Sequence, residues 1–215
     1  MRVVFFDLDG TLINSGEGIV KSVDYALQKM SLPTLSGDSS WVIGPPLWDS
    51  FVKLGVARAN LDQAVTLYRE RYTVIGYLES RLYNGILAQL AQLQQNGYEL
   101  CLATSKPHVT ARKITSHFAI SPYLSHQFGS EQDGTRSDKT SLLKHALAEV
   151  GVSAANAIMI GDRSYDAVGA HANGLKVLGA VYGFGTVGEL QQTGVDGLIE
   201  TPHDLAAGVI QHLPF

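Results

Sequence analysis

The chain has 215 residues, of which 45% are hydrophobic and 17% charged, so it can bury a core and is not a disordered chain. The formal net charge is -4 and no block of like charges occurs, which argues against nucleic acid as a partner. The single cysteine excludes an intrachain disulfide, and no apolar stretch approaches a membrane span, so we expect a cytoplasmic protein that does not bind membranes.

Short apolar runs recur along the chain, and helical patterns lie between them. Runs of this length suit strands that are buried on both faces. The expected strands are residues 3–6, 100–103, 157–160 and 177–181. The intervening patterns predict helices over residues 86–95 and 140–150. Strands that alternate with helices predict an α/β fold with a parallel sheet.

Residues 16–81 interrupt this alternation, because they lack a buried-strand run and carry two apolar stripes at helical spacing. A linker rich in Ser, Gly and Pro, residues 31–46, separates the two stripes. We therefore expect a helical subdomain, residues 16–81, inserted into an α/β core that consists of residues 1–15 and 82–215.

The first strand runs into an acidic segment, Asp7-Leu8-Asp9-Gly10-Thr11. Residues two apart in an extended backbone share a face, so Asp7 and Asp9 point the same way. They follow the carboxyl end of a buried strand, where open α/β sheets bind ligands. Two carboxylates this close repel each other unless a proton or a cation intervenes, and Mg²⁺ is the natural cation. An ordinary turn rich in Asp and Gly is the alternative.

A second segment, Ala103–Pro107, joins a strand to an expected helix start. Ser105 fits the N-cap of this helix and Pro107 its first turn. A hydroxyl together with the free backbone N–H groups of a helix start can bind phosphate. A cap without any further role is the alternative.

Two more segments complete the set. Lys139 stands at the start of the helix at 140–150, where a cation opposes the helix dipole, so we expect an anion opposite it. Lys144, inside that helix, is the other candidate for this position. For each lysine, the alternative interpretation is an ordinary surface side chain. Asp162 ends the strand at 157–160, and a helical turn would place Asp166 on the same side. Acids at a helix start are the alternative here.

These four segments, in this order, resemble the motifs of the haloacid dehalogenase superfamily of phosphatases. The resemblance covers residues 1–15 and about 82–200, and it implies a Rossmann-like core with an inserted α-helical cap. It implies that Asp7 is the nucleophile and Asp9 the general acid/base. Among the other residues it makes Lys139 catalytic, assigns phosphate binding to Thr104, Ser105 and Gly10, and assigns Mg²⁺ to Asp7, Asp9, Asp162 and Asp166.

Three further stretches narrow the resemblance to the phosphoglycolate phosphatase-like branch, namely Ile43–Leu47, Ala103–Pro107 and Tyr182–Gly185. Asn14 and Asn84 depart from that branch. We expect a Mg²⁺-dependent phosphatase of a small phosphorylated metabolite, with 2-phosphoglycolate first, as a monomer or homodimer. A 5'-nucleotidase, a pyrophosphatase, a sugar-phosphate phosphomutase and a phospho-acceptor domain without turnover are the alternatives.

Two features bear on substrate selection and on a competing fold. The cap cations that could meet an acidic leaving group are Lys53, Arg58, Arg69 and Arg71, although a solvated helix face is the simpler interpretation of each. The glycine pattern at residues 183–188 is typical of dinucleotide binding, but too little chain follows it for that fold. We therefore interpret it as a glycine-rich loop near the active site.

Overall fold

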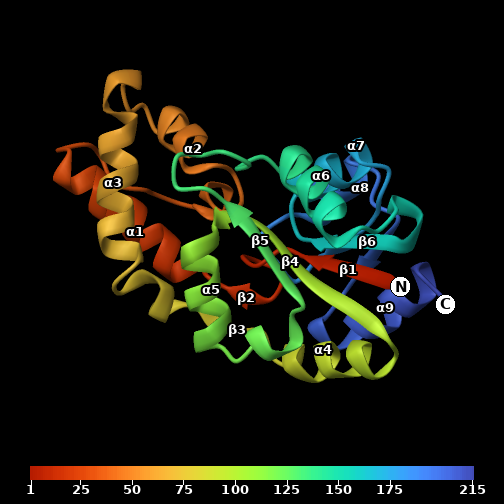
Figure 1. Cartoon of the computed structure of the whole chain (residues 1–215). Helices are drawn as coiled ribbons and strands as arrows, with labels where there is room; N and C mark the ends of the chain where they lie inside the picture. Colours follow the sequence, from red (N-terminus) through yellow and green to blue (C-terminus); the bar gives the residue numbers. More distant parts are fainter. The chain divides into compact units, whose positions relative to one another are not determined.

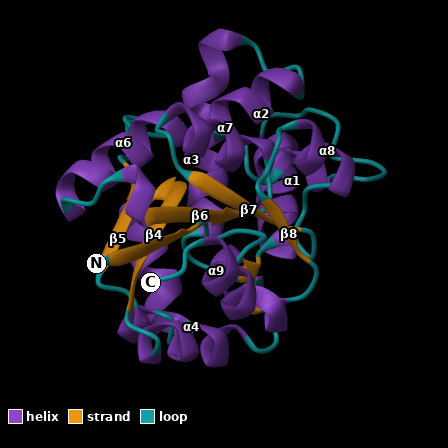
Figure 2. Ribbon diagram, turned by 90° about the vertical axis from the view of Figure 1, so that its right-hand side faces the viewer, coloured by secondary structure: helices purple, strands orange, loops and turns teal.

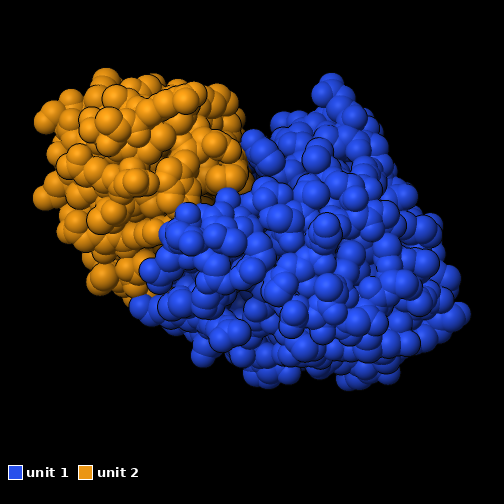
Figure 3. Space-filling view, turned by 45° about the horizontal axis from the view of Figure 1, so that its top comes forward, with its two compact units in different colours: residues 1–13, 82–215 blue, residues 14–81 orange.

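The computed structural model describes residues 1–215 and divides into two compact units. Unit 1 comprises Met1–Ile13 and Leu82–Phe215, and unit 2 comprises Asn14–Arg81 (Figure 3). None of the helices combines the length and the apolar character that crossing a membrane would need.

A six-stranded sheet forms the centre of unit 1, with the strand order β5-β4-β1-β6-β7-β8. All neighbouring strands in it are parallel. The strands are β1 (Arg2–Phe6), β4 (Tyr98–Pro107), β5 (His126–Ser130), β6 (Ala157–Gly161), β7 (Lys176–Ala180) and β8 (Gly197–Ile199). Because β1 lies between β4 and β6, the carboxyl ends of these three strands meet at one edge of the sheet.

Helices cover both faces of this sheet. The helices are α4 (Ile86–Gln95), α5 (His108–His117), α6 (Lys139–Val150), α7 (Ser164–Ala172), α8 (Val187–Gln192) and α9 (Leu205–His212). Figure 2 shows α6 and α7 on one face and α4 and α9 on the other. Short 3-10 turns are η4 (Ser121–Tyr123), η5 (Ala154–Asn156) and η6 (Pro202–Asp204). The expected helices at 86–95 and 140–150 are α4 and α6.

The core beneath α6 and α7 is formed by apolar side chains that these helices and the strands contribute. Phe5 of β1, Met159 of β6 and Leu143 of α6 are fully buried in it. Burial of such side chains contributes about 1.5–3 kcal/mol each, so the central strands and the helices that cover them form a rigid support for the loops at the carboxyl edge.

Unit 2 is helical. It contains α1 (Gly16–Lys29), α2 (Leu47–Lys53) and α3 (Leu61–Tyr72), with the 3-10 turns η1 (Ser40–Val42), η2 (Arg58–Asn60) and η3 (Gly76–Glu79). The Arg71 guanidinium binds both carboxylate oxygens of Glu79, at 2.8 and 2.9 Å, and so ties α3 to η3. The short strands β2 (Ile13–Asn14) and β3 (Arg81–Leu82) pair where the chain leaves and re-enters unit 1.

The α/β fold with a parallel sheet is confirmed, and the four expected strands correspond to β1, β4, β6 and β7. The sequence did not predict β5 and β8, which lie at the two ends of the sheet. The physical reason is that an end strand is covered less completely, so its sequence need not be a continuous apolar run.

Candidate active site at the carboxyl edge of the sheet

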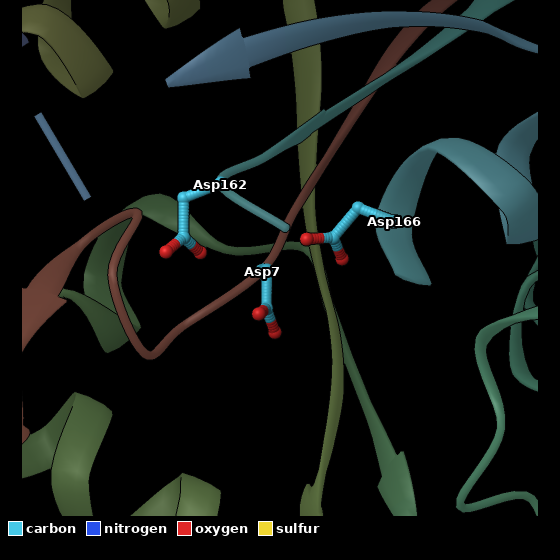
Figure 4. Close-up of side chains that lie close together, drawn as sticks. All are labelled: Asp7, Asp162 and Asp166. Carbon is cyan, nitrogen blue, oxygen red and sulfur yellow. The ribbon is translucent and has the colours of Figure 1, made fainter. Parts of the chain in front are cut away.

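Three carboxylates from distant parts of the sequence meet at the carboxyl edge of the sheet (Figure 4). Asp7 follows β1 and donates its backbone N–H to the carbonyl of Ile160, at 2.9 Å. Asp162 follows β6, and Asp166 lies in the first turn of α7. One carboxylate oxygen of each lies within 4.8 Å of the others, and all three residues are buried. The strand order of the sheet therefore gathers these acids in one place.

One explanation for the Asp162–Asp166 pair was wrong. The two side chains do not share a helical turn, because α7 begins at Ser164 and Asp162 precedes it. Asp166 instead caps the start of α7, where its carboxylate accepts the backbone N–H of Arg163 at 3.1 Å. The adjacency of β1 and β6, not helical spacing, brings Asp162 and Asp166 toward Asp7.

Lys139 lies between two of these acids. Its ammonium Nζ is 2.8 Å from an oxygen of Asp7 and 2.8 Å from an oxygen of Asp166, and it donates to the carbonyl of Ala103 at 2.7 Å. Burial lowers the pKa of Lys139, but the attraction of Asp166 and Asp7 outweighs it and the pKa is raised. Lys139 is thus a buried, charged lysine, whereas Lys144 is exposed.

Asp9 has a different partner. Lys106 Nζ lies 3.0 Å from Asp9 Oδ2, and both side chains are about nine-tenths buried. The Asp9 carboxylate is not among the three that converge, and its Oδ1 is buried without a hydrogen-bond partner. No role for Lys106 follows from the sequence. The sequence predicts more buried acids than buried cations at this edge, and buried carboxylates require counter-charges. This imbalance was the signal that could have pointed to Lys106.

The carboxylates lack enough positive charge. Burial, with a further effect from Asp166 and Asp7, raises the pKa of Asp162 well above its usual range. Burial also raises the pKa of Asp166 to about 6, although the positive charge of Lys139 opposes the shift. Both shifts show that the ionised forms of these carboxyl groups are destabilised in the protein alone.

The charge balance of the site indicates whether it suits a metal ion. Four carboxylates, those of Asp7, Asp9, Asp162 and Asp166, face two ammonium groups, those of Lys106 and Lys139. The excess of two negative charges equals the charge of one divalent cation. The available donors are oxygen atoms, which Mg²⁺ prefers and which differ from the imidazole and thiolate sets of zinc sites. The residues therefore fit a hard divalent cation.

Two loops hold the Asp162 carboxylate in place. Its Oδ2 accepts the backbone N–H of Phe184 at 2.7 Å, and its Oδ1 accepts the hydroxyl of Thr11 at 3.4 Å. Gly10 has φ +84°, and a Cβ there would lie 2.0 Å from Asp162 Oδ2. A Cβ on Gly185 would lie 1.9 Å from the Asp162 carbonyl oxygen. The glycine-rich segment after β7 thus packs directly against the acidic cluster.

The expected phosphate-binding segment differs from the prediction. Ser105 is not a helix N-cap, because β4 continues to Pro107 and α5 begins one residue later. The parallel pairing with β5 is interrupted between Thr104 and Pro107, where Ser105 lies, and it resumes at Pro107 and Ser130; the Ser130 hydroxyl donates to the Ser105 carbonyl at 2.8 Å. The strand thus continues past Ser105, and the helix begins too late for Ser105 to cap it. Thr104 is buried next to Ala103, whose carbonyl binds Lys139.

The proteins to which this chain is similar match it across both units. A family model described as haloacid dehalogenase-like hydrolase matches residues 4–180. The chain is 43% identical to a 5'-nucleotidase from Pseudomonas aeruginosa, over 87% of this chain and 86% of that protein. It is 36% identical to the tyrosine-protein kinase PtkA from Mycobacterium tuberculosis, over 89% of this chain and 66% of that protein. Among solved structures, one described as a predicted phosphatase from Clostridium acetobutylicum has a TM-score of 0.93 and 37% identity, with 98% of each chain covered.

Proposed function

We propose that this chain, which belongs to the haloacid dehalogenase-like hydrolase family, is a Mg²⁺-dependent phosphatase that hydrolyses a small phosphate monoester. The observation that carries the proposal is the convergence of Asp7, Asp162 and Asp166 within 4.8 Å, with the Lys139 ammonium between Asp7 and Asp166. Phosphoryl transfer depends mainly on alignment and on charge neutralisation, and this arrangement offers both.

Asp7 is the proposed nucleophile. Lys139 binds one of its carboxylate oxygens, which leaves the other to attack phosphorus while the bond to the leaving oxygen breaks. The product of this step is an aspartyl-phosphate on Asp7. Lys139 also places a positive charge where the phosphoryl oxygens become more negative. A divalent cation held by Asp7, Asp162 and Asp166 and by the carbonyl of Asp9 would neutralise charge on the phosphoryl group.

Asp9 is the proposed general acid and base. In the first step it gives a proton to the leaving oxygen, and in the second it removes a proton from the water that attacks the aspartyl-phosphate. Lys106 binds Oδ2 of Asp9, whereas Oδ1 has no hydrogen-bond partner. We therefore propose that the Asp9 carboxylate, held at Oδ2 by Lys106, exchanges the proton. Thr104, beside Ala103 at the same edge, is proposed to bind a phosphoryl oxygen.

The cap cations differ in their availability for an acidic leaving group. Arg71 is bound to Glu79, and the Arg69 guanidinium lies over the Trp48 ring at 5.3 Å. Lys53 and Arg58 line a cavity of about 470 Å³ within unit 2, together with Trp48, and the Lys53 ammonium also lies over the Trp41 ring at 4.1 Å. We propose that Lys53 and Arg58 are the cap cations that select the substrate.

Two substrate classes suit this proposal. The motif resemblance favours 2-phosphoglycolate, and the 5'-nucleotidase relative supports a nucleoside 5'-monophosphate as the alternative. Both are phosphate monoesters with a polar leaving group, so the chemistry at Asp7 and Asp9 is the same. Pyrophosphate and a phosphomutase reaction on sugar phosphates complete the set to be tested.

Phosphate release tests the proposal. The purified chain is assayed with 2-phosphoglycolate, nucleoside monophosphates, sugar phosphates and pyrophosphate, with Mg²⁺ and with EDTA. We expect release that requires Mg²⁺, and we expect the Asp7→Asn variant to lose at least about a thousandfold in rate. Full activity of Asp7→Asn would overturn the assignment. Phosphoryl transfer to a sugar or a tyrosine peptide without phosphate release would overturn the hydrolase.

A further inference from the structure

A second cavity lies in unit 1, apart from the acidic cluster. It has a volume of about 430 Å³ and is lined by residues 124–129, which belong to the end strand β5 and the turn that precedes it. Helix α5 and helix α6 also line it, and Figure 1 shows both beside β5. None of the residues proposed for catalysis lines this cavity.

The cavity presents guanidinium groups with unused donors. The guanidinium of Arg112 on α5 makes no hydrogen bond or ion pair with the protein, and the carbonyl of Arg112 accepts the Thr115 hydroxyl. Arg136 binds Glu131 through one terminal nitrogen, but its Nε is buried without a hydrogen-bond partner. Glu131 is neutralised by this contact, and Glu149, the other acid of the lining, is exposed. Guanidinium groups bind phosphate oxygens in pairs, so these free donors suit a phosphate group.

Three aromatic or imidazole rings stand beside the arginines in the cavity lining. The Phe128 ring stacks on the His126 ring, with centroids 5.8 Å apart and planes at 8°. The His145 ring meets Phe128 edge-on, at 5.9 Å and 84°. Aromatic and imidazole rings arranged in this way offer surfaces for another planar ring. The cavity therefore combines a surface for a flat ring with donors for a phosphate.

The cavity wall is connected to the catalytic segments. Glu131 contacts His108 Nδ1 at 3.3 Å and binds Arg136, so it joins two sides of the cavity. His108 follows Lys106 by two residues, and Arg136 precedes Lys139 by three. A phosphate that competes with Glu131 for Arg136 would therefore alter the segments that carry both catalytic-site lysines.

We propose that this cavity is a regulatory binding site for a nucleoside phosphate. The ring of the ligand packs against the rings of Phe128, His126 and His145, and its phosphate binds Arg112 and Arg136. The binding does not depend on the proposed catalytic reaction and can be measured without turnover, so failure of the one is distinguishable from failure of the other.

Binding is tested with ADP and the full chain. The Asp7→Asn variant in EDTA prevents turnover, and the ring signals of His126 and His145 are followed by NMR, assigned with His126→Gln and His145→Gln. We expect both signals to shift on titration. Adding Arg112→Gln should weaken the ADP affinity reported by these signals about tenfold or more. The matched control Lys144→Gln removes the same charge from an exposed position on α6 outside the cavity, and it should leave the affinity within about twofold.

Regulation is tested with the wild-type sequence at position 7. ADP should change the rate at which phosphate is released from p-nitrophenyl phosphate. This effect of ADP should be lost or reduced in Arg112→Gln and kept in Lys144→Gln. Ring signals that do not move at about 1 mM ADP would overturn the site, as would equal weakening by the two variants. Binding with an identical turnover response in both variants would overturn the regulatory role.

Discussion

Replacement of Lys139 by methionine measures how far the acidic site depends on one ammonium group. The ammonium lies 2.8 Å from both Asp7 and Asp166, and it is buried. Methionine keeps the apolar stem and removes the charge, which leaves two buried carboxylates without their shared partner. Removal of one member of a buried ion pair costs about 3–5 kcal/mol. We expect the free energy of unfolding to fall by about this amount without metal, and turnover to fall about a thousandfold.

Urea unfolding in EDTA, followed by circular dichroism, supplies the stability measurement, and p-nitrophenyl phosphate hydrolysis with Mg²⁺ supplies the rate. The double variant Lys139→Met/Asp166→Asn removes one of the stranded carboxylates, so it should recover part of the lost stability but none of the turnover. Lys144→Met is the matched control, because Lys144 is an exposed lysine of the same helix, and its effect should stay within about 0.5 kcal/mol.

The reasoning would be refuted if Lys139→Met unfolded at the same urea concentration as Lys144→Met and released phosphate at the wild-type rate. Failure of Asp166→Asn to recover any stability in the double variant would show that the lost stability does not come from the stranded charge.

Two further perturbations test the support of the site and the cap. Gly185→Ala would force the loop away from the Asp162 carbonyl, 1.9 Å from the new Cβ; the Mg²⁺ concentration for half-maximal activity should rise about tenfold or more, and an unchanged value would contradict this. Glu79→Gln should lower the free energy of unfolding by about 1.5–3 kcal/mol at pH 7, because the hydrogen bonds from Arg71 hold the pKa of Glu79 below its ordinary 4.5. A lowered folded-state pKa stabilises the protein above pH 4.5, and this contribution is lost as the pH falls through the pKa of Glu79 in the folded protein. The difference in unfolding free energy between Glu79→Gln and wild type should therefore shrink in acid. A difference that persists in acid would contradict the assignment.

The central strands could be predicted because they are buried on both faces. Val3–Phe6 of β1 is fully buried, and only a continuous apolar run is compatible with that position. The end strand β5 mixes exposed His126 with half-buried Gln127 and Phe128, so its sequence does not differ from that of a loop. Its strand conformation comes from pairing with β4, from which α5 separates it in the sequence.

The positions of the acids followed from the sequence for a similar reason. Asp7 and Asp162 each come directly after an apolar run, and parallel strands deliver such residues to the same edge of a sheet. Ser105 shows the limit of local rules, because its sequence suits a helix cap whereas β4 continues past it to Pro107, which pairs with Ser130 of β5. Pairing on either side of an irregularity can thus keep a residue within a strand despite its local preference.

The sequence by itself determined the alternation of strands and helices, the helical insert as an expectation, and which acids stand at strand ends. Only the tertiary structure decided that Lys139 forms ion pairs with Asp7 and Asp166 while Lys106 forms one with Asp9. The hydrogen bond from the Phe184 backbone N–H to Asp162 also appears only in the tertiary structure. The physical reason is that apolar periodicity records burial along one segment. A charge pair depends instead on distances between segments, which the packing of the whole sheet establishes.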